Sequence, residues 1–297
     1  MNFSSAVLSV CLLFPTLLAA QSADKLTMLE GSLKIIRGVN VYKADRNAEG
    51  MIVRQGDMIE SSDGGFSQFE FAGGTIVALG PSSKVFLARL ASGHKGGGAP
   101  GQPVANLILL SGWLKAESNP ASGTYRYSTS LFSLASASGS ILIHLDADGC
   151  DAYLESGSAS VGEGSSETTW RQTAVAKSGQ FFSRKTGKNM VTLTRPSSSF
   201  VETMPVPFQD TLPSRSSRFD GKKLPEPKPD HLVTFADLQP WLALPAGWRR
   251  SLVDRFEPRL ADASFHAQIE AHLAQYPEWD AILHPEKESS AKKSEKP

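Results

Sequence analysis

This sequence has little cysteine. It also has no excess of positive or negative charge and no cluster of metal-binding residues. Two cysteines occur among 297 residues, and Cys11 lies in a segment that we expect to be removed, which leaves Cys150 as a lone thiol. A lone thiol cannot form an internal disulfide, and the six histidines are scattered along the chain. This pattern argues against a disulfide framework, structural zinc and redox chemistry.

Neither sign of charge is in excess. Lysine plus arginine equal aspartate plus glutamate at 30 each. The chain therefore lacks the overall basic character with which proteins attract nucleic acid or an anionic membrane, and we expect no nucleic-acid partner. Apolar residues make up 40% of the sequence, which is enough to bury a core.

The long apolar run at the N-terminus covers residues 6–20 and ends in small residues, a pattern typical of a secretory signal peptide. As a helix it would span roughly 22 Å, less than the ~30 Å hydrocarbon core, and Pro15 would kink it. We predict a signal peptide over residues 1–20 with cleavage between Ala20 and Gln21. A lipoprotein-type cleavage before Cys11 is the weaker alternative. The mature protein would be periplasmic, with the cell surface as a second possibility, and would have no transmembrane segment.

Between residues 26 and 195, glycine-centred corners separate short segments with strand-like alternation. Phe69 and Phe71 would share one face of a strand while Gln68 and Glu70 face the other way, which is the period-two pattern of a half-buried strand. Glycine recurs because it enters positive φ cheaply and so allows tight corners. This repeated alternation of glycine corners and short strand-like segments predicts an all-β body and argues against an α/β enzyme core.

The order of these motifs resembles the FecR-type periplasmic domain over about residues 30 to 185. The motifs are Gln55-Gly-Asp-Met-Ile, Ser62-Asp-Gly-Gly-Phe, Phe69-Glu-Phe-Ala-Gly-Gly-Thr-Ile-Val, Leu110-Ser-Gly-Trp, Glu155-Ser-Gly-Ser-Ala-Ser-Val and Lys177-Ser-Gly-Gln. The resemblance implies an all-β, solenoid-like stack of short strands and a role in binding or signal relay in the bacterial envelope. The best-known members carry a cytoplasmic helical anti-sigma region and one membrane span before this domain. We expect neither here, because five residues precede the apolar run.

Three further segments follow the β region. Residues 196–230 are rich in proline and serine without periodicity, which predicts an extended linker. Residues 231–284 predict a small helical module, in which Thr234 and Asp237 form a capping box and Asp262 caps a later helix. Residues 285–297 form a charged tail that we expect to be disordered.

Four aromatic residues are the candidate partner-binding residues: Trp241, Trp248, Phe256 and Trp279. They lie in about fifty residues, too few for an independent core of ordinary stability. The module must therefore either dock on the β domain or keep an apolar face for a partner.

No pattern in the sequence identifies a catalytic, cofactor-binding or metal-binding residue. The three carboxylates of residues 146–151 fit a tight turn better than a calcium loop, which needs more oxygen ligands. His144 is interpreted as a surface imidazole on a strand, and Ser92 with Lys95 matches a Ser-x-x-Lys pattern only inside a glycine-rich loop.

These observations predict an exported, non-enzymatic envelope protein that binds an unidentified protein or glycan without a cofactor. Two alternatives stay open. A structural or adhesion protein of the cell surface would use a free sheet edge. An enzyme acting on cell-wall glycan would need paired carboxylates on facing strands.

Overall fold

The computed structural model describes residues 24–90, 103–163 and 170–285. The apolar run with its cleavage site at Ala20 and Gln21, the pair Ser92 and Lys95, and the tail from residue 286 lie outside the described residues. In the described part of the chain, no helix has the length and apolar character needed to cross a membrane.

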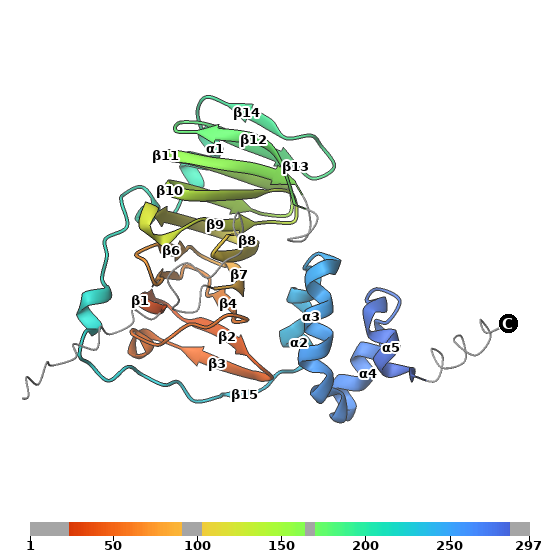
Figure 1. Ribbon diagram of the computed structural model, residues 1–297. Helices are drawn as coiled ribbons and strands as arrows, with labels where there is room; N and C mark the ends of the chain where they lie inside the picture. The colour runs from red at the N-terminus through yellow and green to blue at the C-terminus, as the bar shows by residue number, and fades with distance from the viewer. Residues whose placement is uncertain (1–23, 91–102, 164–169, 286–297) are drawn as a thin grey trace, which may run out of the picture.

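The body is a single sheet, in which the described residues form fifteen strands (Figure 1). They are β1 (Lys25–Glu30), β2 (Leu33–Arg37), β3 (Asn40–Ala44), β4 (Met58–Ser61), β5 (Phe66–Glu70), β6 (Ile76–Leu79), β7 (Lys84–Arg89), β8 (Ala105–Ser118), β9 (Tyr125–Ser128), β10 (Ser133–Leu145), β11 (Gly149–Glu163), β12 (Arg171–Lys177), β13 (Phe181–Lys185), β14 (Val191–Leu193) and β15 (His231–Leu232). The main path runs β14-β13-β11-β10-β9-β8-β7-β4-β2-β3-β15, with a branch β1-β5-β6 that joins β8 and with β12 beside β11. β8 and β9 pair in parallel, and the other described strand pairings are antiparallel.

The predicted solenoid-like stack of short strands is wrong. The body is one largely open, mixed sheet with several helices added to it. β8, β10 and β11 are 14, 13 and 15 residues long, and the glycines that we expected to end short strands lie inside them instead. Gly112, Gly139 and Gly157 have positive φ there, so they bend the strands while the pairing continues on either side.

Gly139 and Gly157 are required by close approach as well as by conformation. They face each other across β10 and β11. A Cβ atom on Gly139 would lie 2.1 Å from the carbonyl oxygen of Ser156, and one on Gly157 would lie 2.3 Å from that of Ser138. No side chain fits at either position unless the two main chains separate.

One face of the sheet forms a central hydrophobic core to which every strand from β1 to β13 contributes. Its other face carries two further apolar clusters. One contains Trp113, Leu142 and Phe181, and the other contains Met58 and Phe86. Strands buried on both faces need covering layers, and both layers come from the chain after residue 195.

Residues 196–230, which we name the strap, cover the first of these clusters. The strap holds α1 (Ser198–Thr203) and the short 3₁₀ turns η3 (Val206–Phe208) and η4 (Ser216–Phe219), and it runs along one side of the sheet (Figure 1). Phe200, Phe208 and Leu212 are buried in the cluster around Trp113. The segment predicted as a linker is thus extended along much of its length but packed against the sheet.

The second cluster is covered by the C-terminal helices. They are α2 (Phe235–Leu238), η5 (Gln239–Ala243), α3 (Ala246–Phe256), η6 (Glu257–Ala261), α4 (Ala263–Ala271), η7 (Pro277–Trp279) and α5 (Asp280–Leu283); η1 (Arg46–Ala48) and η2 (Pro120–Ser122) are turns within the sheet region. The predicted capping box of Thr234 and Asp237 is confirmed, and Asp262 caps α4 by accepting a hydrogen bond from the Phe265 N–H at 2.9 Å.

We expect Gly157→Ala to destabilise the fold by about 2 kcal/mol more than Gly179→Ala, because a main-chain clash is added to the conformational strain. Both glycines have φ +83°, but a Cβ on Gly179 meets nothing within 4 Å. Gly179→Ala should therefore report the cost of positive φ alone, about 1–2 kcal/mol. Urea unfolding of both variants measures the difference. Equal destabilisation would contradict the close approach at Gly157.

Candidate functional site

The four aromatic residues singled out from the sequence all belong to, or pack against, the apolar cluster that the helical module shares with the sheet. Trp241, Phe256 and Trp279 are fully buried, and the partly buried Trp248 contacts Phe86 of β7 edge-on at 6.3 Å between ring centroids. Of the two outcomes that the sequence left open, the structure has the module docked on the sheet. In this docked arrangement the four aromatic side chains pack against other residues of the same chain.

The module begins with a strand that closes one edge of the sheet. β15 pairs antiparallel with β3, placing His231 opposite Val41, and the Val233 N–H donates to the Val39 carbonyl at 2.9 Å. Thr234 follows at once as the N-cap of α2. Two residues therefore separate the edge strand from the first helix, so the strand and the helix are held in one place.

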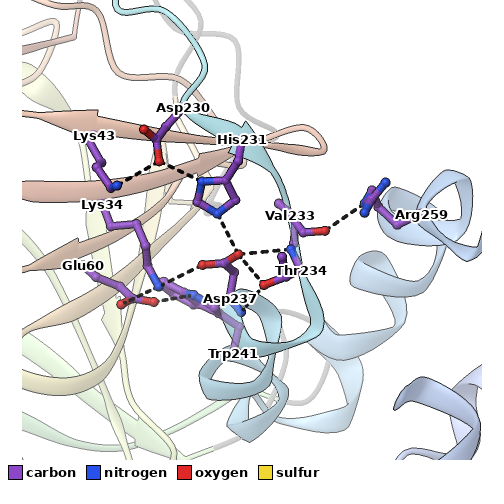
Figure 2. Close-up of polar contacts among 10 residues, drawn as sticks. All are labelled: Lys34, Lys43, Glu60, Asp230, His231, Val233, Thr234, Asp237, Trp241 and Arg259. Atoms are coloured by element: carbon purple, nitrogen blue, oxygen red, sulfur yellow. Dashed lines mark hydrogen bonds and ion pairs between the residues drawn. The ribbon is translucent and has the colours of Figure 1, made fainter. Parts of the chain in front are cut away.

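His231 connects this edge strand to the helix through two aspartates (Figure 2). Its Nδ1 lies 2.8 Å from Oδ2 of Asp230, and its Nε2 lies 3.0 Å from Oδ2 of Asp237. The Asp237 carboxylate also accepts from the Thr234 N–H at 3.1 Å as part of the capping box. Lys43 of β3 pairs with Asp230 at 2.9 Å. We name these four charged residues, Lys43, Asp230, His231 and Asp237, the latch.

A second polar chain ties the latch to the interior of the sheet. Lys34 of β2 lies 3.6 Å from Oδ1 of Asp237 and 3.1 Å from Oε2 of Glu60. The other oxygen of Glu60 accepts from the indole N–H of Trp241 at 2.9 Å, as Figure 2 shows. The buried tryptophan therefore has its polar atom satisfied by the sheet.

The latch shifts the pKa of each of its acids and of its imidazole. Hydrogen bonds to Asp230 and then Asp237 raise the pKa of His231. The hydrogen bond from Lys43, followed by that from His231, lowers the pKa of Asp230. Burial opposes ionisation of Asp237, but hydrogen bonds from Thr234 and His231 still lower its pKa. Each shift favours the charged form, so the latch is most stable with a protonated imidazole between two carboxylates.

Arg255 attaches the module to the sheet by donating to main-chain carbonyls, and Arg259 makes the same kind of contact within the module. Arg255 of α3 donates to the carbonyls of Ile36 at 2.9 Å, Gly38 at 2.9 Å and Gly56 at 2.5 Å. Burial lowers the pKa of Arg255 to about 10, and the charge of Asp57 opposes this. Arg259 donates to the carbonyl of Val233 at 2.8 Å (Figure 2). Guanidinium groups suit this role because their fixed fork presents several donors at once.

The remaining sequence candidates have structural roles. The turn prediction for residues 146–151 is confirmed, since Asp146 Oδ1 accepts from the N–H groups of Asp148 and Gly149 between β10 and β11. His144 stacks on Trp113 at 4.2 Å between ring centroids, and burial lowers its pKa. Cys150 is a free, buried thiol whose pKa is raised by burial, which makes it unreactive.

No protein-family model and no curated protein matches this chain. The solved structures that match include two of a putative anti-sigma factor from Parabacteroides distasonis ATCC 8503, at 1.65 and 2.50 Å resolution. Each has a TM-score of 0.36, with sequence identities of 10% and 8%. The matches cover 46% and 49% of this chain and 59% and 64% of the others, so this chain spans about three fifths of their length. Likeness at this level is partial and says nothing of what this chain binds.

Arg255→Met should lower the free energy of unfolding by about 3 kcal/mol, because the carbonyls of Ile36, Gly38 and Gly56 lose their charged donor. The matched control is Arg250→Met on the same helix, at an exposed position, which should stay within about 0.5 kcal/mol of wild type. Urea unfolding followed by tryptophan fluorescence measures both. Similar losses in the two variants would show that the carbonyl contacts do not hold the module.

The attachment of β15 should weaken as pH rises from about 6.5 upward. His231 has a folded-state pKa above its unfolded value, so its contribution is complete below the unfolded pKa of ~6.5 and is lost as pH rises through the folded pKa. Hydrogen-exchange protection of the Val233 N–H, corrected for intrinsic exchange, should fall over this range. His231→Gln should remove the pH dependence, whereas His266→Gln on the exposed side of α4 should leave it. Unchanged pH dependence in His231→Gln would rule out the latch as its cause.

Proposed function

We propose that this protein is an exported, non-enzymatic module of the bacterial envelope that binds a partner protein and relays that binding between its helical module and its sheet. The motif order of residues 30–185, which resembles the FecR-type periplasmic domain, supports this proposal from the sequence. The signal-like segment that ends at Ala20 supports the location.

The observation that carries the proposal is the docked helical module. Its residues Trp241, Phe256 and Trp279 are fully buried in the apolar cluster that it shares with the sheet. The opposite side of α4 exposes polar side chains, including His266, Gln268 and Glu270. A partner that contacts this exposed side therefore acts on a body already packed on β2, β3, β4, β7 and β8.

The latch gives the relay a defined point of attachment. It joins the edge of the sheet at β3 to the first helix of the module through charged hydrogen bonds rather than through apolar contact alone. Partner binding that strains α2 would be transmitted to β15 and from there to β3, because Asp237 belongs both to the helix cap and to the latch.

Site-specific crosslinking in living Gram-negative cells tests the proposal. A photoreactive amino acid at Gln268, exposed on α4, should give a crosslinked product of discrete mass. The control position is Lys188, exposed in the turn between β13 and β14, where we expect no such product. Products from Lys188 alone, or from neither position, would contradict a partner contact through the module.

Export is checked separately. Expression of the full chain in a Gram-negative host should give periplasmic protein whose N-terminus lies near Gln21, because the apolar run of residues 6–20 ends in small residues. Intact-mass analysis of the periplasmic fraction measures the mature end. Protein that retains Met1 in the cytoplasm or membrane would disprove signal removal.

A further inference from the structure

A hollow of about 390 Å³ lies between the sheet and the strap, and no residue of the helical module lines it. β8, β10 and β11 form its floor, and the strap contributes one wall through Thr211. The residues that line it are acidic, hydroxylated or glycine, and none is cationic: Glu117, Ser118, Gly139, Ser140, Glu155, Ser156 and Thr211.

Two carboxylates from strands on either side of β10 meet at this hollow. Glu117 lies on β8 and is paired in register with Ser140 of β10. Glu155 lies on β11, and its Oε2 accepts a hydrogen bond from the Ser140 hydroxyl at 2.5 Å. Ser140 therefore stands between the two acids, and both side chains are largely but not fully buried, with exposures of 20% and 28%.

Lys115 lies behind the hollow and forms ion pairs with both acids, the one to Glu155 being the shorter. It is 1% exposed, and its ammonium group lies 2.9 Å from Oε2 of Glu155. The same group donates to the carbonyls of Phe208 and Asp210 in the strap, each at 2.9 Å. These three contacts use its three N–H donors, and Glu117 stays 3.9 Å away.

Glu117 is partly buried and is the less compensated of the two acids, because its ion pair with Lys115 is the longer one. Its Oε1 accepts from the Leu212 N–H at 2.7 Å. Burial raises the pKa of Glu117, and the repulsion of Glu155 adds a smaller increase. The hydrogen bond from Leu212 and the charge of Lys115 oppose this rise. Two carboxylates and one ammonium leave one negative charge, which a cation in the hollow would neutralise.

The hollow is kept open by small residues. Gly139 forms part of the lining, and the remaining positions besides the two glutamates are serine or threonine. The Ser118 and Ser156 hydroxyls already hydrogen-bond to Tyr127 and to the Ser140 N–H, which fixes their positions. A ligand that fits this lining must bring hydrogen-bonding groups rather than an apolar surface.

We propose that this hollow binds a small hydroxylated amine, of the amino-sugar class, with its ammonium group on Glu117 and its hydroxyls on the serine and threonine lining. This site is separate from the latch and goes beyond the relay function. It meets the requirement of paired carboxylates set out for a glycan-active enzyme. Both acids, however, hold hydrogen bonds to the protein, Glu155 to Lys115 and Ser140 and Glu117 to Leu212, and such fixed partners favour binding over proton transfer.

Titration of the mature protein with three sugars tests the site. The probes are D-glucosamine, at a pH at which its amine is protonated, N-acetyl-D-glucosamine and D-glucose. Glucosamine should bind at least about tenfold more tightly than the two neutral sugars, because they cannot supply the missing positive charge. Equal affinity for all three, or binding of none, would overturn the proposal.

Glu117→Gln should weaken glucosamine binding about tenfold and leave the fold intact, since the amide oxygen can still accept from the Leu212 N–H. The matched control is Glu163→Gln on β11, whose carboxylate pairs with Arg184 at 2.8 Å and does not line the hollow. A second variant, Thr211→Phe, occupies space in the hollow without a change of charge and should also reduce binding. Wild-type affinity in both Glu117→Gln and Thr211→Phe would overturn the assignment. These outcomes are independent of the crosslinking at α4.

Discussion

The burial of both faces of the sheet is the constraint on which the rest of this structure depends. One face forms the central core, and the other carries the clusters around Trp113 and around Phe86. Exposed apolar areas of this size are rare on soluble proteins. The strap and the helical module supply the missing covers, so the chain after residue 195 belongs to the same packed body as the strands.

Charged side chains of the sheet and the helical module hold the covering segments in place through hydrogen bonds to main-chain groups. The strap has little regular structure of its own, so its amides and carbonyls need partners elsewhere. Glu70 of β5 accepts hydrogen bonds from the Ser214 hydroxyl and from the N–H groups of Arg215 and Ser216. Buried Lys115 donates hydrogen bonds to the carbonyls of Phe208 and Asp210. Arg255 does the same in the opposite direction, from module to sheet.

The strand content and the helix caps were predictable from local pattern, whereas the course of the long strands was not. The alternation around Phe69 indicates a strand, and Thr234 with Asp237 indicates a helix start, because both signals act over a few residues. Gly139 and Gly157 misled the prediction, since a positive φ is compatible with a strand end and with a bend inside a strand. Glu117 and Lys115 on alternate positions of β8 gave no sign of their roles, which depend on strap residues about 95 positions later.

The pairing of β15 with β3 bears on how the chain is made. β3 is complete after residue 44, but the strand that closes its outer edge contains His231 and lies near the end of the sequence. During synthesis or transport the outer edge of β3 therefore stays unpaired until residues 231–232 are available. An open edge of this kind can pair with other chains. The order of synthesis therefore leaves the edge of β3 open to such pairing until residues 231–232 have been made and have paired with it.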